Sequence, residues 1–194
     1  MVRITAGALK GLTVRVPRHI RATGEKVRQA LFNIVGELVV GARVVDGFAG
    51  SGALGLEALS RGARFVVFLD FHPACLNAIR ENLARIPPGV MVGGWNVVRG
   101  DALRNLRVLA RQGDRFDLII LDPPYQGNWG KKSLNAVAEC GILAPTGILC
   151  VEHAHRSESP LIVGPLVMRA QHRFGETVLS FYRVGVGSGS GTLR

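Results

Sequence analysis

Two kinds of apolar pattern alternate along most of the chain. Short runs of mostly apolar residues, rich in Val, Ile and Leu, have the length and composition of buried strands. Between them lie segments in which apolar residues recur every three or four positions, as they do on one side of a helix. The expected strands are 43–47, 65–70, 95–99, 117–122 and 148–152, and the expected helices are 26–35, 53–61, 73–86, 102–111 and 131–140. This alternation predicts an α/β fold in which a parallel sheet carries helices on both faces.

The two ends of the chain depart from this alternation. Residues 2–5 and 12–16 predict a short β-hairpin, which turns through Gly7 and Gly11. Near the other end, residues 161–170 and 177–184 are typical of strands and have no helical stretch between them, so we expect the sheet to finish on an antiparallel strand pair.

Three segments follow from these patterns. We expect an N-terminal hairpin and linker at 1–24, a main domain at 25–184, and a tail at 185–194 whose Gly and Ser content is typical of flexible chain. A chain of 194 residues is long enough to form one domain without disulfides.

The cysteines and the hydropathy limit the environment of the protein. Cys75, Cys140 and Cys150 are odd in number and lack metal-site spacing, so they are interpreted as small core residues in a reducing compartment. No apolar run approaches the roughly 18 residues of a membrane span. We therefore expect a soluble, cytoplasmic protein. We also expect it to be a monomer.

The positive charge is concentrated near the N-terminus. The chain has a formal net charge of +10, and residues 1–28 hold seven basic residues against Glu25 alone. These basic residues are Arg3, Lys10, Arg15, Arg18, Arg21, Lys26 and Arg28. Such a cluster favours contacts with the phosphates of a polyanion. A solvated basic surface is the alternative, because charge alone carries no specificity.

A glycine-rich turn links the strand at 43–47 to the helix that follows it. Gly50, Gly52 and Gly55 match the dinucleotide pattern G-x-G-x-x-G, and Asp70 follows at the required distance. Asp46, however, would place a second anion beside a pyrophosphate, which Coulomb repulsion disfavours. S-adenosylmethionine carries an ammonium and a sulfonium instead, so it is the preferred ligand. The alternative is a tight turn whose glycines serve only packing.

A second motif, Asp122-Pro123-Pro124-Tyr125, ends the strand at 117–122, and ligands of open parallel sheets bind at this edge. Methylation of an exocyclic amino group of a base requires that its delocalised nitrogen lone pair be directed at the methyl carbon. The Asp122 carboxylate and the Pro123 carbonyl can each accept one N–H, and Pro124 forms a rigid wall. Tyr125 can stack on an extruded base. A simple strand stop accounts for the prolines but not for the acid and the aromatic residue.

With these motifs, the chain resembles the bacterial 16S rRNA guanine-N2 methyltransferases, which are class I S-adenosylmethionine-dependent enzymes. The resemblance runs from residue 3 to about residue 184 and rests on four segments. They are 3–11, 21–33, 46–62 and 122–125. The family implies a Rossmann-like, mostly parallel seven-stranded sheet, and an N-terminal hairpin that grips rRNA.

The resemblance also implies roles for individual residues. Asp122, Pro123, Pro124 and Tyr125 would be catalytic and hold the guanine. The cofactor would be bound by Asp46, Phe48, Ala49, Gly50, Ser51, Gly52, Asp70, Asp101 and Ala102, with Asp101 facing the adenine amino group. RNA would be bound by Arg3, Lys10, Arg15, Arg21, Arg28, Lys131 and Lys132. No metal is expected.

Two positions depart from the family pattern. The glutamate that would bind the ribose hydroxyls in relatives falls on Phe68, and Asp70, which points to the same side of the strand, is its candidate substitute. Residues 21–23 read Arg-Ala-Thr where the family has Arg-Pro-Thr.

Two further features invite a functional interpretation. Trp129, with Lys131 and Lys132, could clamp the backbone beside a flipped base, or could form a mobile surface loop. His153 and His155 are spaced like a metal-binding pair in a loop, but no third ligand is evident.

The leading hypothesis is an S-adenosylmethionine-dependent methyltransferase that acts on 16S rRNA or the small ribosomal subunit and releases S-adenosylhomocysteine. A DNA adenine-N6 methyltransferase is the alternative enzyme, but reading a DNA sequence generally needs added surface. A non-catalytic RNA-binding ribosome-assembly module is the third hypothesis, which the intact Asp122 to Tyr125 motif disfavours.

Overall fold

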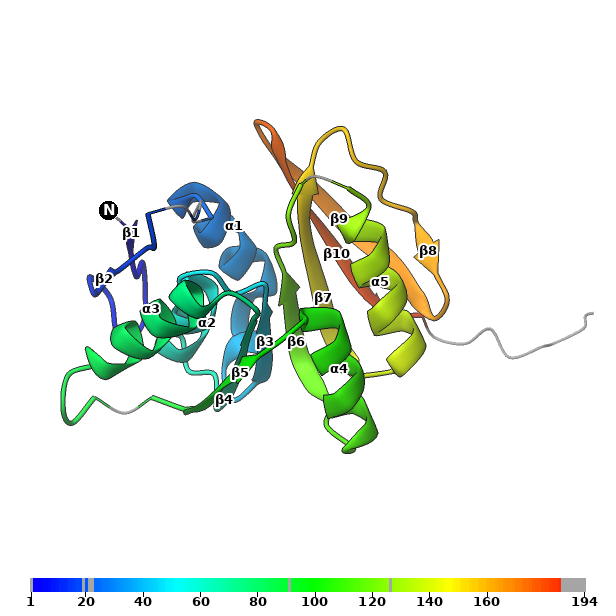
Figure 1. Ribbon diagram of the computed structural model, residues 1–194. Coiled ribbons are helices and arrows are strands. Elements are labelled where there is room, and N and C mark those ends of the chain that lie inside the picture. Colours follow the sequence, from blue (N-terminus) through cyan, green and yellow to red (C-terminus); the bar gives the residue numbers. More distant parts are fainter. Residues whose placement is uncertain (1, 19, 21–22, 91, 126, 186–194) are drawn as a thin grey trace, which may run out of the picture.

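The computed structural model describes residues 2–18, 20, 23–90, 92–125 and 127–185. Its main sheet has the strand order β5-β4-β3-β6-β7-β10-β9-β8, as Figure 1 shows. The strands are β3 (Arg43–Gly47), β4 (Phe65–Asp70), β5 (Gly94–Arg99), β6 (Phe116–Leu121), β7 (Leu143–Ala154), β8 (Ile162–Val163), β9 (Leu166–Phe174) and β10 (Thr177–Val184). The first five pair in parallel, and β7 to β10 pair antiparallel. The predicted α/β fold with an antiparallel end is confirmed.

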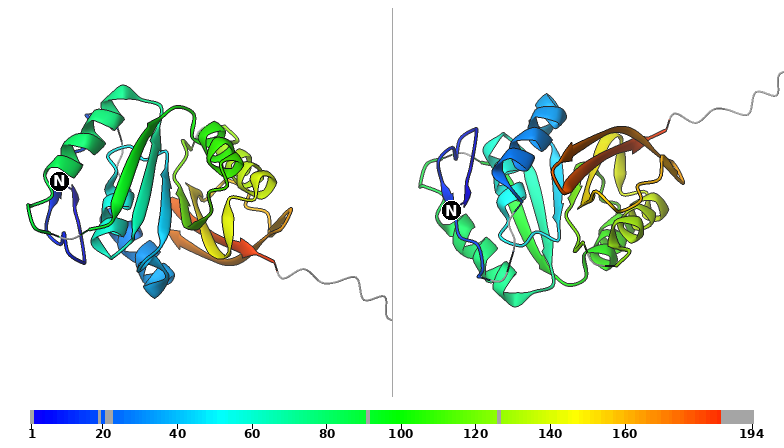
Figure 2. Two further views of the ribbon diagram at one scale, coloured as in Figure 1. Left: turned by 90° about the horizontal axis from the view of Figure 1, so that it is seen from below. Right: turned by 90° about the horizontal axis from the view of Figure 1, so that it is seen from above.

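Five α-helices cover both faces of this sheet (Figure 2). They are α1 (Glu25–Val35), α2 (Ala53–Ser60), α3 (Pro73–Ala84), α4 (Ala102–Arg111) and α5 (Trp129–Cys140), and the 3₁₀ helix η1 (Gly36–Val39) follows α1. Helices α1 to α3 share one apolar cluster with the sheet, and α4 and α5 share the other. Alternate residues of the central strand β3 serve the two clusters, because Val44 faces one and Val45 the other. No helix among the described residues has the length and hydropathy to cross a membrane.

The antiparallel end of the sheet differs in detail from the expectation. The single strand predicted at 161–170 is divided by a turn at Gly164 and Pro165, where Gly164 has φ +55°. The result is the two-residue strand β8 beside β9, so the sheet has eight strands instead of seven. Of the expected tail, only Gly185 is described, and it donates a hydrogen bond to the Pro165 carbonyl at 2.7 Å.

The N-terminal hairpin is present but shorter than predicted, with β1 (Val2–Arg3) paired to β2 (Thr13–Val14). Ile4, Leu9 and Val14 are only 2–3% exposed and belong to the same apolar cluster as α1 and α2. The hairpin therefore forms part of the main core.

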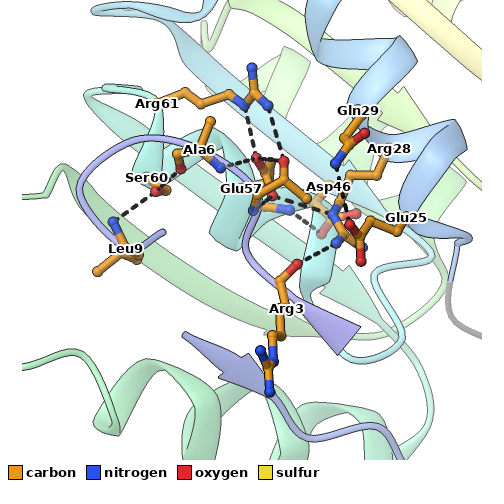
Figure 3. A network of polar contacts seen from close by, with 12 residues as sticks. Arg3, Ala6, Leu9, Glu25, Arg28, Gln29, Asp46, Glu57, Ser60 and Arg61 are labelled. Atoms are coloured by element: carbon orange, nitrogen blue, oxygen red, sulfur yellow. Dashed lines mark hydrogen bonds and ion pairs between the residues drawn. The ribbon is translucent and has the colours of Figure 1, made fainter. Parts of the chain in front are cut away.

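Glu57, a carboxylate within the apolar helix α2, binds the hairpin to this core (Figure 3). It accepts hydrogen bonds from the backbone N–H of Thr5 at 2.9 Å and of Ala6 at 3.2 Å. It also pairs with Arg61 at 2.9 Å and with Arg28 of α1 at 3.3 Å. The side chains of Arg28 and Glu57 are 0% exposed, so the two charges neutralise each other away from water.

A second contact between the hairpin and α2 requires glycine. Ser60 accepts a hydrogen bond from the Leu9 N–H, and its carbonyl accepts one from the Ala8 N–H. Gly7 has φ +80°, and a Cβ at this position would lie 1.8 Å from the Ser60 carbonyl oxygen. Only glycine lets the two backbones approach this closely.

We predict that Glu57→Gln destabilises the protein strongly. The substitution keeps the shape of the side chain but leaves the Arg28 charge buried without its counterion, which costs about 3–5 kcal/mol. Urea unfolding of the variant measures this loss. Glu81→Gln is the matched control, because Glu81 pairs with Arg15 at the surface, where an ion pair contributes at most about 1 kcal/mol. Equal losses for the two variants would contradict the role assigned to Glu57.

Candidate functional site

A cavity of about 490 Å³ opens at the carboxyl ends of β3, β4 and β6. Its walls come from the glycine turn after β3, the end of β4, the start of α4, and the segment after β6. The segment before α1, the turn between β9 and β10, and single residues of α3, α5 and β7 also contribute to the wall. The two sequence motifs thus lie in one cavity, as the parallel sheet predicts.

The glycine turn lines the cavity with four of the predicted residues, Phe48, Ala49, Gly50 and Ser51. Phe48 has φ +62°, a conformation that is uncommon for a residue with a side chain and is concentrated at functional sites. Gly52 does not line the cavity. It has φ +77°, and a Cβ there would lie 3.1 Å from Ile79, so this glycine serves the turn and its packing.

Asp46 lies behind the turn instead of facing the ligand. It is 1% exposed, and its Oδ2 accepts the Gly55 N–H in the first turn of α2 at 2.8 Å. Burial raises the pKa of Asp46 well above its usual range, and the nearby carboxylates of Asp122 and Asp70 add to this effect. A carboxyl group that is buried behind the turn and does not line the cavity is not the predicted direct partner of a cationic ligand, so this assignment is corrected.

Asp70 reaches the cavity from the end of β4. Its Oδ2 accepts the Gly50 N–H and its Oδ1 accepts the His72 N–H, each at 2.8 Å. Phe68 is 0% exposed and packs beneath the turn, where a Cβ at Gly55 would lie 2.2 Å from its ring. Position 68 is therefore part of the core, and Asp70 is the acid of β4 that faces the cavity.

The wall beside Asp70 contains two predicted cofactor-binding residues and two further residues. Asp101 and Ala102 line the cavity as predicted, and Asp101 caps α4 by accepting the Arg104 N–H at 2.7 Å. Phe71 and His72 also line it, and Phe71 is 65% exposed. Because Phe71 and His72 directly follow Asp70 in the sequence, their place in the cavity wall could have been predicted.

All four residues of the Asp122 to Tyr125 motif line the cavity. The Tyr125 hydroxyl donates a hydrogen bond to Glu152 Oε1 at 2.9 Å and lies 2.9 Å from Thr177 Oγ1. Burial raises the pKa of Tyr125 to about 12, so the hydroxyl keeps its proton at neutral pH. The far end of the ring is thereby anchored to β7 and β10. The sequence carries no local signal for Glu152 or Thr177.

Asp122 is half-buried and accepts a hydrogen bond at Oδ2 from the Thr23 hydroxyl at 3.0 Å. Thr23 comes from the segment before α1, which also contributes Gly24 to the cavity wall. This contact was not anticipated either.

Trp129 occupies the next part of the wall. Its ring meets Phe48 edge to face, with 6.1 Å between centroids, and Lys132 Nζ lies 5.0 Å from its centroid. A cation over an indole face is an attractive arrangement. Trp129 begins α5 and therefore lies in a helix instead of a loop.

The predicted RNA-binding residues have different environments. Arg28 is buried against Glu57 and cannot contact a ligand at the surface, so this assignment is corrected. Arg21 lies outside the described residues. The exposed members of the set are Arg3, Lys10, Arg15, Lys131 and Lys132.

The histidine pair makes separate contacts. His153 belongs to β7 and not to a loop, and its ring bonds the Ala154 carbonyl and the Ser159 and Ser180 hydroxyls. His155 pairs with Glu176 at 2.9 Å. Within the part of the chain that the structure describes, no three His, Cys, Asp or Glu residues are grouped as metal ligands.

The sequence of this chain matches a protein family and is similar to several named proteins. Residues 2–183 match the model of the family described as conserved hypothetical protein 95. The ribosomal RNA small subunit methyltransferase D of Haemophilus influenzae is 34% identical over 163 residues, 83% of this chain and 82% of that protein. The protein of the same name from Escherichia coli K12 is 29% identical over 184 residues, 94% of this chain and 89% of that protein.

A solved structure resembles the whole fold. A hypothetical protein of Thermus thermophilus superposes with a TM-score of 0.81 at 28% identity, and the match covers 95% of this chain and 100% of that one.

Proposed function

We propose, from the premise that the chain belongs to the family of conserved hypothetical protein 95, that it is an S-adenosylmethionine-dependent methyltransferase of 16S rRNA. The names of the Haemophilus influenzae and Escherichia coli relatives support a substrate in the small ribosomal subunit. We further propose that the acceptor is the N2 amino group of a guanine, and that the protein acts as a monomer in the cytoplasm. The observation that carries the proposal is that one cavity joins the glycine turn and Asp70 to the Asp122 to Tyr125 motif.

The residues of the first half of the cavity fit a nucleoside cofactor. Asp70 is fixed by two backbone N–H groups, and each carboxylate oxygen has a second lone pair with which to accept a ribose hydroxyl. Asp101 and Ala102 would face the adenine edge, and the exposed Phe71 ring offers it an apolar surface. The turn from Phe48 to Ser51 would hold the methionine part. When bound, the cofactor supplies an electrophilic methyl group on a sulfonium.

The residues of the second half fit a base with an exocyclic amino group. Tyr125 would stack on the base, and its anchored hydroxyl prevents the ring from swinging out of this position. Asp122 and the Pro123 carbonyl would accept the two N–H groups and aim the nitrogen lone pair. As the nitrogen gains positive charge, the Asp122 carboxylate stabilises it, and it then receives the proton that the nitrogen loses.

The exposed basic residues would hold the RNA that surrounds this base. Arg3, Lys10 and Arg15 lie on the hairpin side of the molecule, while Lys131 and Lys132 lie on α5, whose first residue lines the cavity. Each phosphate contact releases counterions and makes binding weaker at higher salt.

We predict that Asp70→Ala weakens S-adenosylmethionine binding by at least about 10- to 100-fold, because the loss of even one hydrogen bond to a charged group costs roughly 1.5–3 kcal/mol. Calorimetric titration measures the affinity. Asp117→Ala is the matched control. Asp117 also accepts a backbone N–H, from Arg43 at 2.8 Å, but it lies at the end of the sheet away from the cavity. Wild-type affinity in Asp70→Ala would contradict the cofactor assignment.

We predict that Asp122→Ala keeps cofactor affinity and loses about 10²- to 10³-fold in the single-turnover rate, as expected for a group that stabilises charge in the transition state. Tyr125→Ala should lower both the rate and the affinity for RNA, because stacking of one base contributes ~1–3 kcal/mol. The assay uses labelled cofactor with saturating 16S rRNA or small subunits, and RNA affinity is measured separately. Methyl transfer by Asp122→Ala at the wild-type rate would favour the non-catalytic RNA-binding hypothesis.

A further inference from the structure

The contact between Thr23 and Asp122 joins two segments that lie 99 positions apart in the sequence. We propose that Thr23 is a positioning residue, which holds the Asp122 carboxylate in the orientation that receives the amino group of the target base. The proposal rests on the methyl-transfer function of the cavity. The segment before α1 would then both form part of the cavity wall and orient a catalytic side chain.

The backbone on both sides of this contact is well fixed. Asp122 directly follows β6, and its N–H bonds the Gly47 carbonyl of β3 at 3.3 Å. Thr23 precedes Gly24, the N-cap of α1, whose carbonyl accepts the Arg28 N–H at 3.0 Å. The Arg28 side chain is in turn held by Glu57 of α2. The hydroxyl and the carboxylate therefore meet because the sheet and α1 are packed on the same core.

The Thr23 hydroxyl can restrain the side chain of Asp122. A carboxylate at the end of a strand can rotate about its Cα–Cβ and Cβ–Cγ bonds, and a small error in the placement of a reacting group costs rate. The Thr23 hydroxyl occupies Oδ2 and so restricts this rotation. Threonine suits the task better than serine, because its β-branch limits χ1 and presents the hydroxyl in few orientations.

The geometry also separates Thr23 from the binding of the cofactor. Asp70 is held by the N–H groups of Gly50 and His72, and neither of these residues is bonded to Thr23 in the described contacts. Loss of the Thr23 hydroxyl should consequently change the orientation of Asp122 and leave the nucleoside half of the cavity intact.

The test compares Thr23→Val, which keeps the shape and removes the hydroxyl, with Thr23→Ser, which keeps the hydroxyl. Steady-state methylation of 16S rRNA should show kcat reduced by roughly 10- to 100-fold in Thr23→Val, the range for a hydrogen bond to a charged group, with KM for RNA and cofactor affinity unchanged. Thr23→Ser should recover most of the rate. Thr146→Val is the matched control, because Thr146 is exposed on β7 and its described side-chain contact is to its carbonyl, from Arg183, and not to its hydroxyl, so this variant should retain wild-type kcat.

A double-mutant comparison identifies the route of the effect. If Thr23 acts through Asp122, Thr23→Val should cause no further loss in an Asp122→Ala background. Independent, multiplying losses would overturn the proposal, as would wild-type kcat in Thr23→Val or a failure of Thr23→Ser to recover the rate. Wild-type protein that methylates no RNA would overturn the proposed function together with this inference, whereas the other outcomes overturn the positioning role alone.

Discussion

The placement of the N-terminal hairpin, α1 and α2 depends on the buried ion pair between Arg28 and Glu57. The pair joins α1 to α2, and its carboxylate also accepts the N–H groups of Thr5 and Ala6. A single buried carboxylate thus holds the hairpin, α1 and α2 together. Removing two charges from water is costly, and hydrogen bonds to Glu57 from Thr5, Ala6 and Arg61, with one from Arg28 to the Arg3 carbonyl, offset part of this cost. Because the segment with Thr23 leads directly into α1, this interaction fixes one wall of the functional site as well as the fold.

Other parts of the cavity wall depend on anchoring by hydrogen bonds rather than on charge pairing. Asp70 is held by two backbone N–H groups, and Tyr125 is held through its hydroxyl by Glu152 and Thr177. Each of these side chains, which we propose to touch a ligand, thus has a second contact that restrains it before the ligand arrives. Such preorganisation lowers the cost of ordering the site when substrate binds. The parallel strands bring these anchored groups to one edge of the sheet from distant parts of the sequence.

The sequence predicts those features that burial imposes on local patterns. Apolar runs and helical spacing identified the parallel strands and all five α-helices, because both patterns report a buried face. Arg28 was wrongly placed on the surface, although Phe32 follows it at helical spacing and marks the same buried side of α1. The roles of Thr23, Glu152 and Thr177 could not be predicted, since only the tertiary fold brings them to the motif.

The most direct test of the central claim is mass mapping of nuclease fragments of 16S rRNA from cells that lack this protein. The proposed function predicts that one fragment lacks a single methyl group on a guanine, and that purified wild-type protein with labelled S-adenosylmethionine restores that methyl group at N2. Identical fragment masses in cells with and without the protein, or label that enters another base or another RNA, would contradict the account.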